Sequence, residues 1–143
     1  MRLIKIVLCL AIISVLGVVL FKQETVPTES ASCRIRGFSA LVNQGPTQGM
    51  LLTGTLSLEE GAYGALTGGL KSDDGQVYIK VTGTVNGYAL NLAFDLGYSG
   101  RTQTYIFGTG TLSKPFPDCT GATGGLLVGP QKGDNGVWSV KGD

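Results

Sequence analysis

Residues 76–97, QVYIKVTGTVNGYALNLAFDLG, contain the strongest fold signal in the chain. Asn86-Gly87 lies in the middle of this stretch, and the dipeptide favours a two-residue type I′ turn because both residues tolerate a positive φ. Such a turn places Val85 opposite Tyr88 and sets every pair that follows. One face of the hairpin is then apolar and the other mostly polar. The turn residues and the hydrophobic alternation therefore predict the same antiparallel hairpin.

A second turn signal, Asp74-Gly75, precedes this hairpin and adds another strand to the sheet. The same two-residue geometry places Leu70 opposite Ile79. The apolar face of the new strand then continues the apolar face of the hairpin. The two turns together predict three consecutive antiparallel strands.

A three-residue loop over 60–62 is expected to connect the strand before these, with Gly61 available for a left-handed conformation. This loop places Leu56 opposite Leu66 and keeps the apolar faces aligned. The predicted meander has strands near 50–59, 63–72, 76–85 and 88–96.

The remainder of the domain continues the β pattern and has no helical periodicity. In residues 103–113, Ile106 and Leu112 are expected to face the core and Tyr105 and Phe107 the solvent, with the reverse assignment as the alternative. Further strands are expected near 34–42, 122–129 and 136–141. The predicted fold class is all-β: an antiparallel meander of about eight short strands that closes as a small up-and-down β-barrel, with a two-sheet β-sandwich as the alternative.

The tetrapeptide TGTL at 53–56 recurs in similar form along these strands, with its glycine on the predicted inner face. Glycine relieves crowding where a sheet coils strongly, so the repeat is expected to let the sheet curve. Inward glycines also leave volume that a ligand can use. Trp138, the single tryptophan, is expected to plug one end of the core, or to stack on a ligand if the barrel encloses one. The candidate ligand-facing residues are Gly54, Gly68, Gly83, Gly110 and Trp138.

Residues 1–32 differ from the rest of the chain in composition. Residues 1–21 combine a basic start with a long apolar run, which is typical of a signal peptide or of an uncleaved signal-anchor helix. The run is close to the ~20 residues that a transmembrane helix needs. Residues 22–32 are polar and predict a linker. The Gly/Thr-rich β-domain, 33–143, is then expected to be extracytoplasmic, either anchored by the N-terminal helix or secreted after cleavage.

Two cysteines, Cys33 and Cys119, fall in the predicted extracytoplasmic domain. In an oxidising compartment such a pair is most simply a disulfide. The loop that it closes is long, so the chain-entropy model predicts a stabilisation of roughly 4–5 kcal/mol. A small domain with a modest core would depend on this cross-link.

The composition excludes several classes of function. The chain has no histidine, which removes Ser-His-Asp and Cys-His catalysis and imidazole metal sites. Lys and Arg total 11 against 10 Asp and Glu, without a basic run, so nucleic acid is not an expected partner. No cofactor, metal ligand or catalytic residue is predicted. An enzyme would have to use carboxylates, and its candidates are Asp95, Asp118 and Asp134.

These observations favour an extracytoplasmic, non-enzymatic small β-domain with a binding or envelope-structural role. The expected contact with a membrane is through the N-terminal segment, and the ligand, partner and oligomeric state stay open. The alternative is a β-barrel that encloses a small apolar or carbohydrate ligand, and a carboxylate-dependent enzyme is a third hypothesis. Asp74, Gly75, Asn86 and Gly87 are expected to serve as turn residues only.

Overall fold

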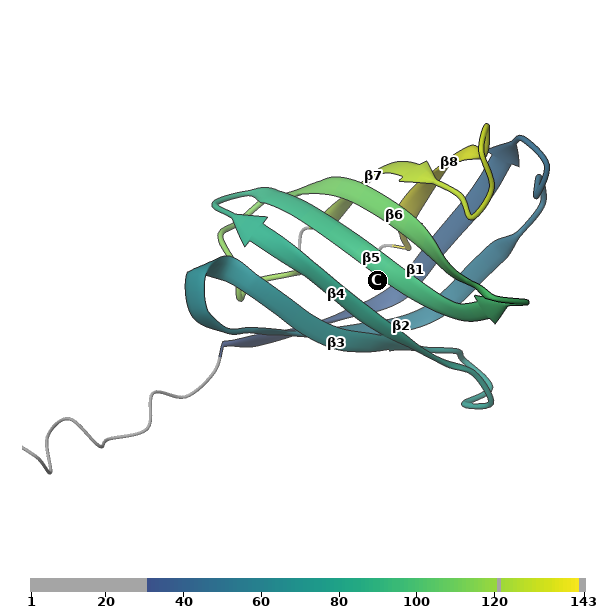
Figure 1. The fold of residues 1–143 in the computed structure, drawn as a ribbon. Helices are drawn as coiled ribbons and strands as arrows, with labels where there is room; N and C mark the ends of the chain where they lie inside the picture. The colour runs from purple at the N-terminus through teal and green to yellow at the C-terminus, as the bar shows by residue number, and fades with distance from the viewer. Residues whose placement is uncertain (1–30, 121, 142–143) are drawn as a thin grey trace, which may run out of the picture.

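The computed structural model describes residues 31–120 and 122–141, which form a closed antiparallel barrel of eight strands (Figure 1). Each strand pairs with the next one in the chain, and β1 pairs with β8 to close the barrel. This arrangement confirms the predicted up-and-down barrel over the two-sheet sandwich. The strands are β1 (Ser32–Gln44), β2 (Leu51–Glu60), β3 (Ala65–Lys71), β4 (Tyr78–Asn86), β5 (Ala89–Ser99), β6 (Thr102–Leu112), β7 (Ala122–Val128) and β8 (Asn135–Val140).

Helix is almost absent from the described residues. A single short 3-10 turn, η1 (Ala62–Gly64), connects β2 to β3. The predicted N-terminal hydrophobic helix and most of the linker lie outside the described residues. Among the residues that are described, no helix has the length and apolar character needed to cross a membrane.

The β3–β4 register is the predicted one, with Leu70 opposite Ile79. The connection between these strands is longer than a two-residue turn, because β3 ends at Lys71 and β4 begins at Tyr78. Asp74 closes this connection through its Oδ1 atom, which accepts hydrogen bonds from Ser72 Oγ at 2.6 Å and from the Gln76 N–H at 2.9 Å. These hydrogen bonds, that from Ser72 foremost, lower the pKa of the Asp74 carboxyl.

The predicted β4–β5 register is wrong by two residues. Val85 pairs with Leu90, and Asn86 is the last strand residue, paired with Ala89. The turn therefore consists of Gly87 and Tyr88. Gly87 has a φ of 59° and Asn86 does not have a positive φ, so the type I′ turn over these two residues does not form. A shift of two residues leaves the paired residues on their predicted faces, which is why hydrophobic alternation could not detect it. Tyr88, expected opposite Val85 on the apolar face, instead lies in the turn and is 52% exposed.

The predicted β2–β3 register is wrong by four residues, since Leu56 pairs with Leu70 and not with Leu66. The loop is not the predicted one over 60–62, because the left-handed residues are Tyr63, with a φ of 57°, and Gly64, with a φ of 73°. The observed pairing runs from Thr55 opposite Lys71 to Glu60 opposite Leu66, so residues 61–65 lie between the two paired segments. Both faces again keep their predicted identity, since the shift is an even number.

The barrel interior is a packed hydrophobic cluster to which all eight strands contribute. Phe38 lies at its centre, with ring-centroid distances of 5.4 Å to Phe94 and 5.6 Å to Trp138. In β6, Ile106 is buried and Phe107 is exposed, as predicted, and Phe107 packs on the outside against Tyr105. The largest fully buried apolar side chains are Phe38, Phe94, Ile35, Leu56, Leu58, Leu66, Leu90, Ile106, Leu112, Val42 and Val81.

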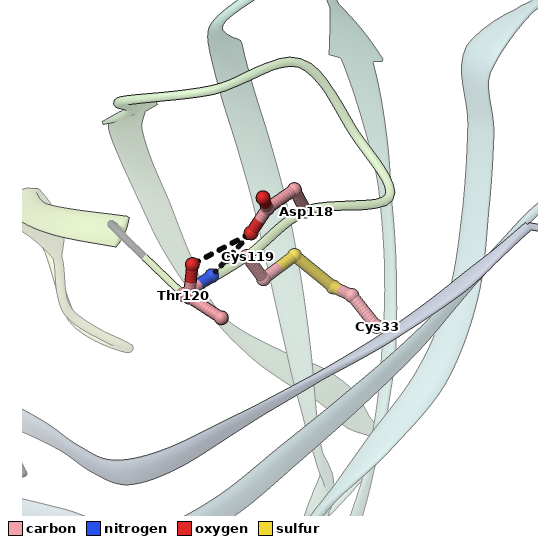
Figure 2. The surroundings of a disulfide bond; sticks show 4 residues. All are labelled: Cys33, Asp118, Cys119 and Thr120. Atoms are coloured by element: carbon pink, nitrogen blue, oxygen red, sulfur yellow. Dashed lines mark hydrogen bonds between the residues drawn. A yellow bond between two sulfur atoms is a disulfide. The ribbon is translucent and has the colours of Figure 1, made fainter.

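The predicted disulfide joins Cys33 to Cys119, with a Cα–Cα distance of 5.8 Å (Figure 2). Cys33 lies at the start of β1, and Cys119 lies in the connection between β6 and β7. Beside it, one oxygen of Asp118 accepts hydrogen bonds from the Thr120 N–H and hydroxyl (Figure 2). The disulfide thus fixes this long connection against the first strand of the barrel.

Candidate functional site

The candidate ligand-facing residues of the interior take part in the packing of the barrel. Trp138 lies within β8 and is only 2% exposed, and its Nε1–H donates a hydrogen bond of 2.9 Å to the Thr109 carbonyl. A Cβ placed on Gly110 would come within 3.0 Å of the Trp138 ring, so this glycine makes room for the indole. Trp138 is therefore packed within the hydrophobic core and anchored there by a hydrogen bond.

The other inward glycines bring neighbouring strands close together. A Cβ on Gly68 would come within 3.0 Å of the Ser57 carbonyl group, which belongs to the paired strand β2. A Cβ on Gly54 or on Gly83 would meet backbone atoms of a neighbouring segment in the same way. The space that a missing side chain leaves is thus taken by protein atoms. These contacts occupy the volume that an enclosed ligand would need next to the glycines.

The outside of the barrel carries a groove of about 740 Å³ over strands β1 to β4. Its floor is formed by Ser57 and Gly69, which pair directly across β2 and β3. Arg34 pairs with Ser57 from the other side and forms a wall on β1. The volume is in the range of small-molecule sites, ~300–1,000 Å³. The groove is hollow because Ser57 and Gly69 are small, whereas longer side chains such as Arg34 surround them.

Tyr78 forms the opposite wall of the groove on β4. A Cβ on Gly69 would come within 3.0 Å of several atoms of the Tyr78 ring, so the ring lies against the β3 backbone at this glycine. The side chain is nevertheless 69% exposed. One part of the ring is therefore held by the sheet while the rest faces solvent, which is the arrangement of an aromatic stacking platform.

Three charged residues line the groove: Arg34, Glu59 and Lys71. Among the described residues none of the three takes part in an ion pair; the ion pair found there joins Lys114 to Asp118 at 3.6 Å. The register keeps Lys71 away from Glu59, because Lys71 pairs with Thr55, four residues along β2 from Glu59, which is roughly 13 Å. The charges of the groove are therefore available to a ligand.

A second hollow, of about 280 Å³, adjoins the groove at Arg34. Its lining includes Arg36 on β1 and Lys141, which follows β8 and whose N–H donates to the Gly37 carbonyl at 2.9 Å. The described lining of this hollow contains three cations and no carboxylate. Arg34 thus lines both the groove, which has two cations and one carboxylate, and the basic hollow beside it.

The three candidate catalytic carboxylates lie in separate hydrogen-bond sets and share no partner. Asp95 on β5 accepts hydrogen bonds from the Gly97 N–H and from Gln103 Nε2, each at 2.8 Å. Asp118 is bound by Thr120, and the resulting hydrogen bonds lower the pKa of its carboxyl. No cluster of histidine, cysteine or carboxylate side chains suited to a metal occurs in residues 31–120 and 122–141.

Asp134 is the buried polar residue of the described barrel, at 1% exposure. Its carboxylate accepts hydrogen bonds from the Thr47 N–H at 2.9 Å, the Thr47 hydroxyl at 2.5 Å and the Gln131 N–H at 2.8 Å. Burial raises the pKa of Asp134, but these hydrogen bonds outweigh it and hold the pKa below its ordinary value. The residue joins the β1–β2 loop to the β7–β8 loop, which is a structural role.

A row of exposed apolar side chains crosses the outside of four paired strands. Leu51, Leu41, Val137 and Leu126 lie on β2, β1, β8 and β7, and each pairs directly with the next. The sequence could not predict this row, because it depends on the pairing of β1 with β8.

Neither the protein-family models nor the curated proteins nor the solved structures provide a match to this chain.

Proposed function

We propose that the protein is an extracytoplasmic, non-enzymatic binding domain that holds its ligand on the outside of the barrel, in the groove over β1 to β4. The observation that carries this proposal is the combination of unpaired Arg34, Glu59 and Lys71 with the open ring of Tyr78 around one hollow. A few charged and aromatic groups that converge on one hollow are the usual means by which a binding site orients its ligand.

The extracytoplasmic location is supported by the disulfide between Cys33 and Cys119, since such bonds persist in oxidising compartments. It is also supported by the basic and apolar character of residues 1–21, which favours export. Under this proposal the N-terminal segment anchors the domain to the membrane or is removed on secretion.

The non-enzymatic character is supported by the engagement of the carboxylates in loop structure. Asp118 and Asp134 each accept hydrogen bonds that keep the pKa of the carboxyl low, whereas a general acid needs a raised pKa. The alternative of a ligand enclosed in the barrel gains no support from Trp138, which already packs against Phe38 and Gly110.

A titration of the full-length ¹⁵N-labelled protein with a library of soluble metabolites and oligosaccharides tests the proposal. Bound ligands are expected to shift the amide signals of Ser57 and Gly69 and to lose affinity in Tyr78→Ala. Tyr98→Ala is the matched control, because Tyr98 is 73% exposed and lies outside the groove. Ligands that bind with equal affinity to both variants, or that shift only interior signals, would show that the groove is not the site.

A second candidate role is envelope-structural, and the apolar row of Leu51, Leu41, Val137 and Leu126 favours it. A continuous uncharged row on the outside of a sheet can pack against the same row of a second copy around a two-fold axis. Sedimentation of the full chain and of Leu126→Ser tests this role, with Tyr98→Ser as an exposed control on β5, outside the row. A dimer in the unsubstituted protein that dissociates only in Leu126→Ser is expected; a monomer at all concentrations rules the role out.

A further inference from the structure

We infer that the ligand of the outer surface is an anionic oligosaccharide, which runs along the groove and into the basic hollow next to it. This inference rests on the proposed function and adds the chemical class of the ligand. It follows from three properties of the two hollows: their charge, the shape of the aromatic wall and their length.

The charge of the combined surface favours an anion. Among the described residues, the two linings contain four cations, Arg34, Arg36, Lys71 and Lys141, and one carboxylate, Glu59. None of these five residues forms an ion pair within residues 31–120 and 122–141. The chain as a whole has a net charge of only +1, so the excess is local and does not reflect a generally basic protein. Unpaired cations around a concave surface raise the local concentration of anions.

Arg34 occupies the position at which the two hollows meet, and it is exposed. Its planar guanidinium can bind a carboxylate or a sulfate group through two parallel hydrogen bonds. The neighbouring floor residue Ser57 adds a hydroxyl, and Glu59, on the same strand, adds a carboxylate that can accept hydrogen bonds from sugar hydroxyls. An acidic sugar presents both kinds of group.

Tyr78 gives the groove an aromatic wall suited to a sugar ring. Its own ring is supported by the backbone at Gly69 and is open to solvent on the remaining side, so a pyranose can stack on it without a rearrangement of the protein. An inorganic anion would use the cations but gain nothing from this ring. The aromatic wall therefore favours an anionic sugar over a simple anion.

The dimensions favour more than one sugar unit. Arg34 and Tyr78 stand three strand spacings apart, which is about 14 Å, and the basic hollow extends beyond Arg34 on the side of Lys141. An extended nucleic acid strand is a less suitable polyanion, because the site offers a single exposed aromatic ring and stacking of successive bases needs a series of them.

Isothermal titration of the full chain with a trisaccharide of galacturonic acid tests the inference, with galactotriose as the neutral control. The acidic trisaccharide is expected to bind at least about tenfold more tightly than the neutral one, and added salt should weaken it. Arg34→Gln is expected to weaken binding about tenfold or more, because one charged bidentate contact is lost. Lys132→Gln removes the same charge from the exposed β7–β8 loop and should change affinity less than about twofold.

Further ligands separate the sources of the negative charge. A sulfated tetrasaccharide from heparin that binds more tightly than the galacturonate identifies sulfate as the recognised group and keeps the inference. Equal binding of the neutral and acidic trisaccharides, equal effects of Arg34→Gln and Lys132→Gln, or preferential binding of single-stranded DNA would overturn it. The fluorescence of the buried Trp138 reports whether each variant is folded.

The two proposals fail in different ways. If neither glycan binds but an uncharged metabolite shifts the Ser57 and Gly69 amide signals, the ligand class is wrong and the groove remains the site. If no compound perturbs those signals, the proposed function and the inference fall together.

Discussion

Replacement of Gly68 by alanine is the sharpest test of how the repeated TG motif shapes the barrel. Gly68 lies on β3, paired with Leu58 of β2. A Cβ at this position would be 2.9 Å from the carbonyl carbon of Ser57, 3.1 Å from Leu58 Cα and closer still to the Ser57 oxygen. All three are backbone atoms, so no side-chain rotation can relieve the contact. The β2 and β3 strands would have to move apart.

The expected cost follows from that movement. Overpacking of a well-packed region typically costs about 1–3 kcal/mol, and strand separation also weakens ladder hydrogen bonds worth about 1 kcal/mol each. The lower entropy of the unfolded alanine chain returns only about 0.4–1 kcal/mol. We therefore expect Gly68→Ala to lower the free energy of unfolding by about 2–3 kcal/mol.

The measurement is guanidinium unfolding of the full chain, followed by the fluorescence of the single, buried Trp138. Gly61→Ala is the control, because a Cβ there has Ala65 O at 3.7 Å as its nearest neighbour and Gly61 has an ordinary φ of −101°. This control should be neutral or slightly stabilising. If Gly68→Ala and Gly61→Ala unfold at the same denaturant concentration, the close approach of the strands at Gly68 is not a constraint and the reasoning fails.

Three further predictions concern the cross-link, the core and acid stability. The double variant Cys33→Ser, Cys119→Ser should lose up to about 4.6 kcal/mol of unfolding free energy, by the chain-entropy model for a separation of 86 residues; an unchanged denaturation midpoint would contradict it. Trp138→Phe should lower the free energy of unfolding by about 1–3 kcal/mol, because it removes the hydrogen bond to Thr109 and part of the core. Thermal melts followed by circular dichroism measure this change, and a smaller loss would mean that the indole is not anchored. Because the pKa of Asp134 is lower in the folded than in the unfolded state, the ionised carboxylate stabilises the fold. This stabilisation is complete above the unfolded-state pKa of about 3.9 and is lost as the pH falls through the folded-state pKa. Asp134→Asn should therefore lower the melting temperature at pH 7, and this difference should shrink as the pH falls below the unfolded value; a constant difference would contradict this.

Much of the barrel could be predicted because strand faces follow from local alternation. Ile106 and Phe107 took their predicted sides, and the spacing around Asp74-Gly75 gave the correct register of β3 with β4. The errors at Leu56 and Val85 were shifts by an even number of residues. Such shifts preserve both faces, so only the conformation of the loop can decide between them.

The groove could not be predicted from local sequence patterns, for a different reason. Ser57, Gly69 and Tyr78 are ordinary outward residues on three strands, and nothing in their spacing indicates a hollow. Their adjacency depends on the exact register of β2 with β3. The basic hollow depends further on the closure of the barrel, which brings Lys141 next to β1 and Arg34.

The amino-acid sequence alone determined the strands, the inner and outer faces of β2 to β6 and the pairing of Cys33 with Cys119, because each of these follows from residue chemistry at short range or from the simple count of cysteines. Only the tertiary structure decided that the inward glycines are filled by neighbouring strands and by Trp138, and that unpaired charges collect around Tyr78 on the outside. The physical reason is that a cavity or a charge cluster is a property of residues distant in the chain. The register of the strands and the closure of the barrel bring these residues together in space, and a periodic sequence pattern carries no information on such long-range contacts.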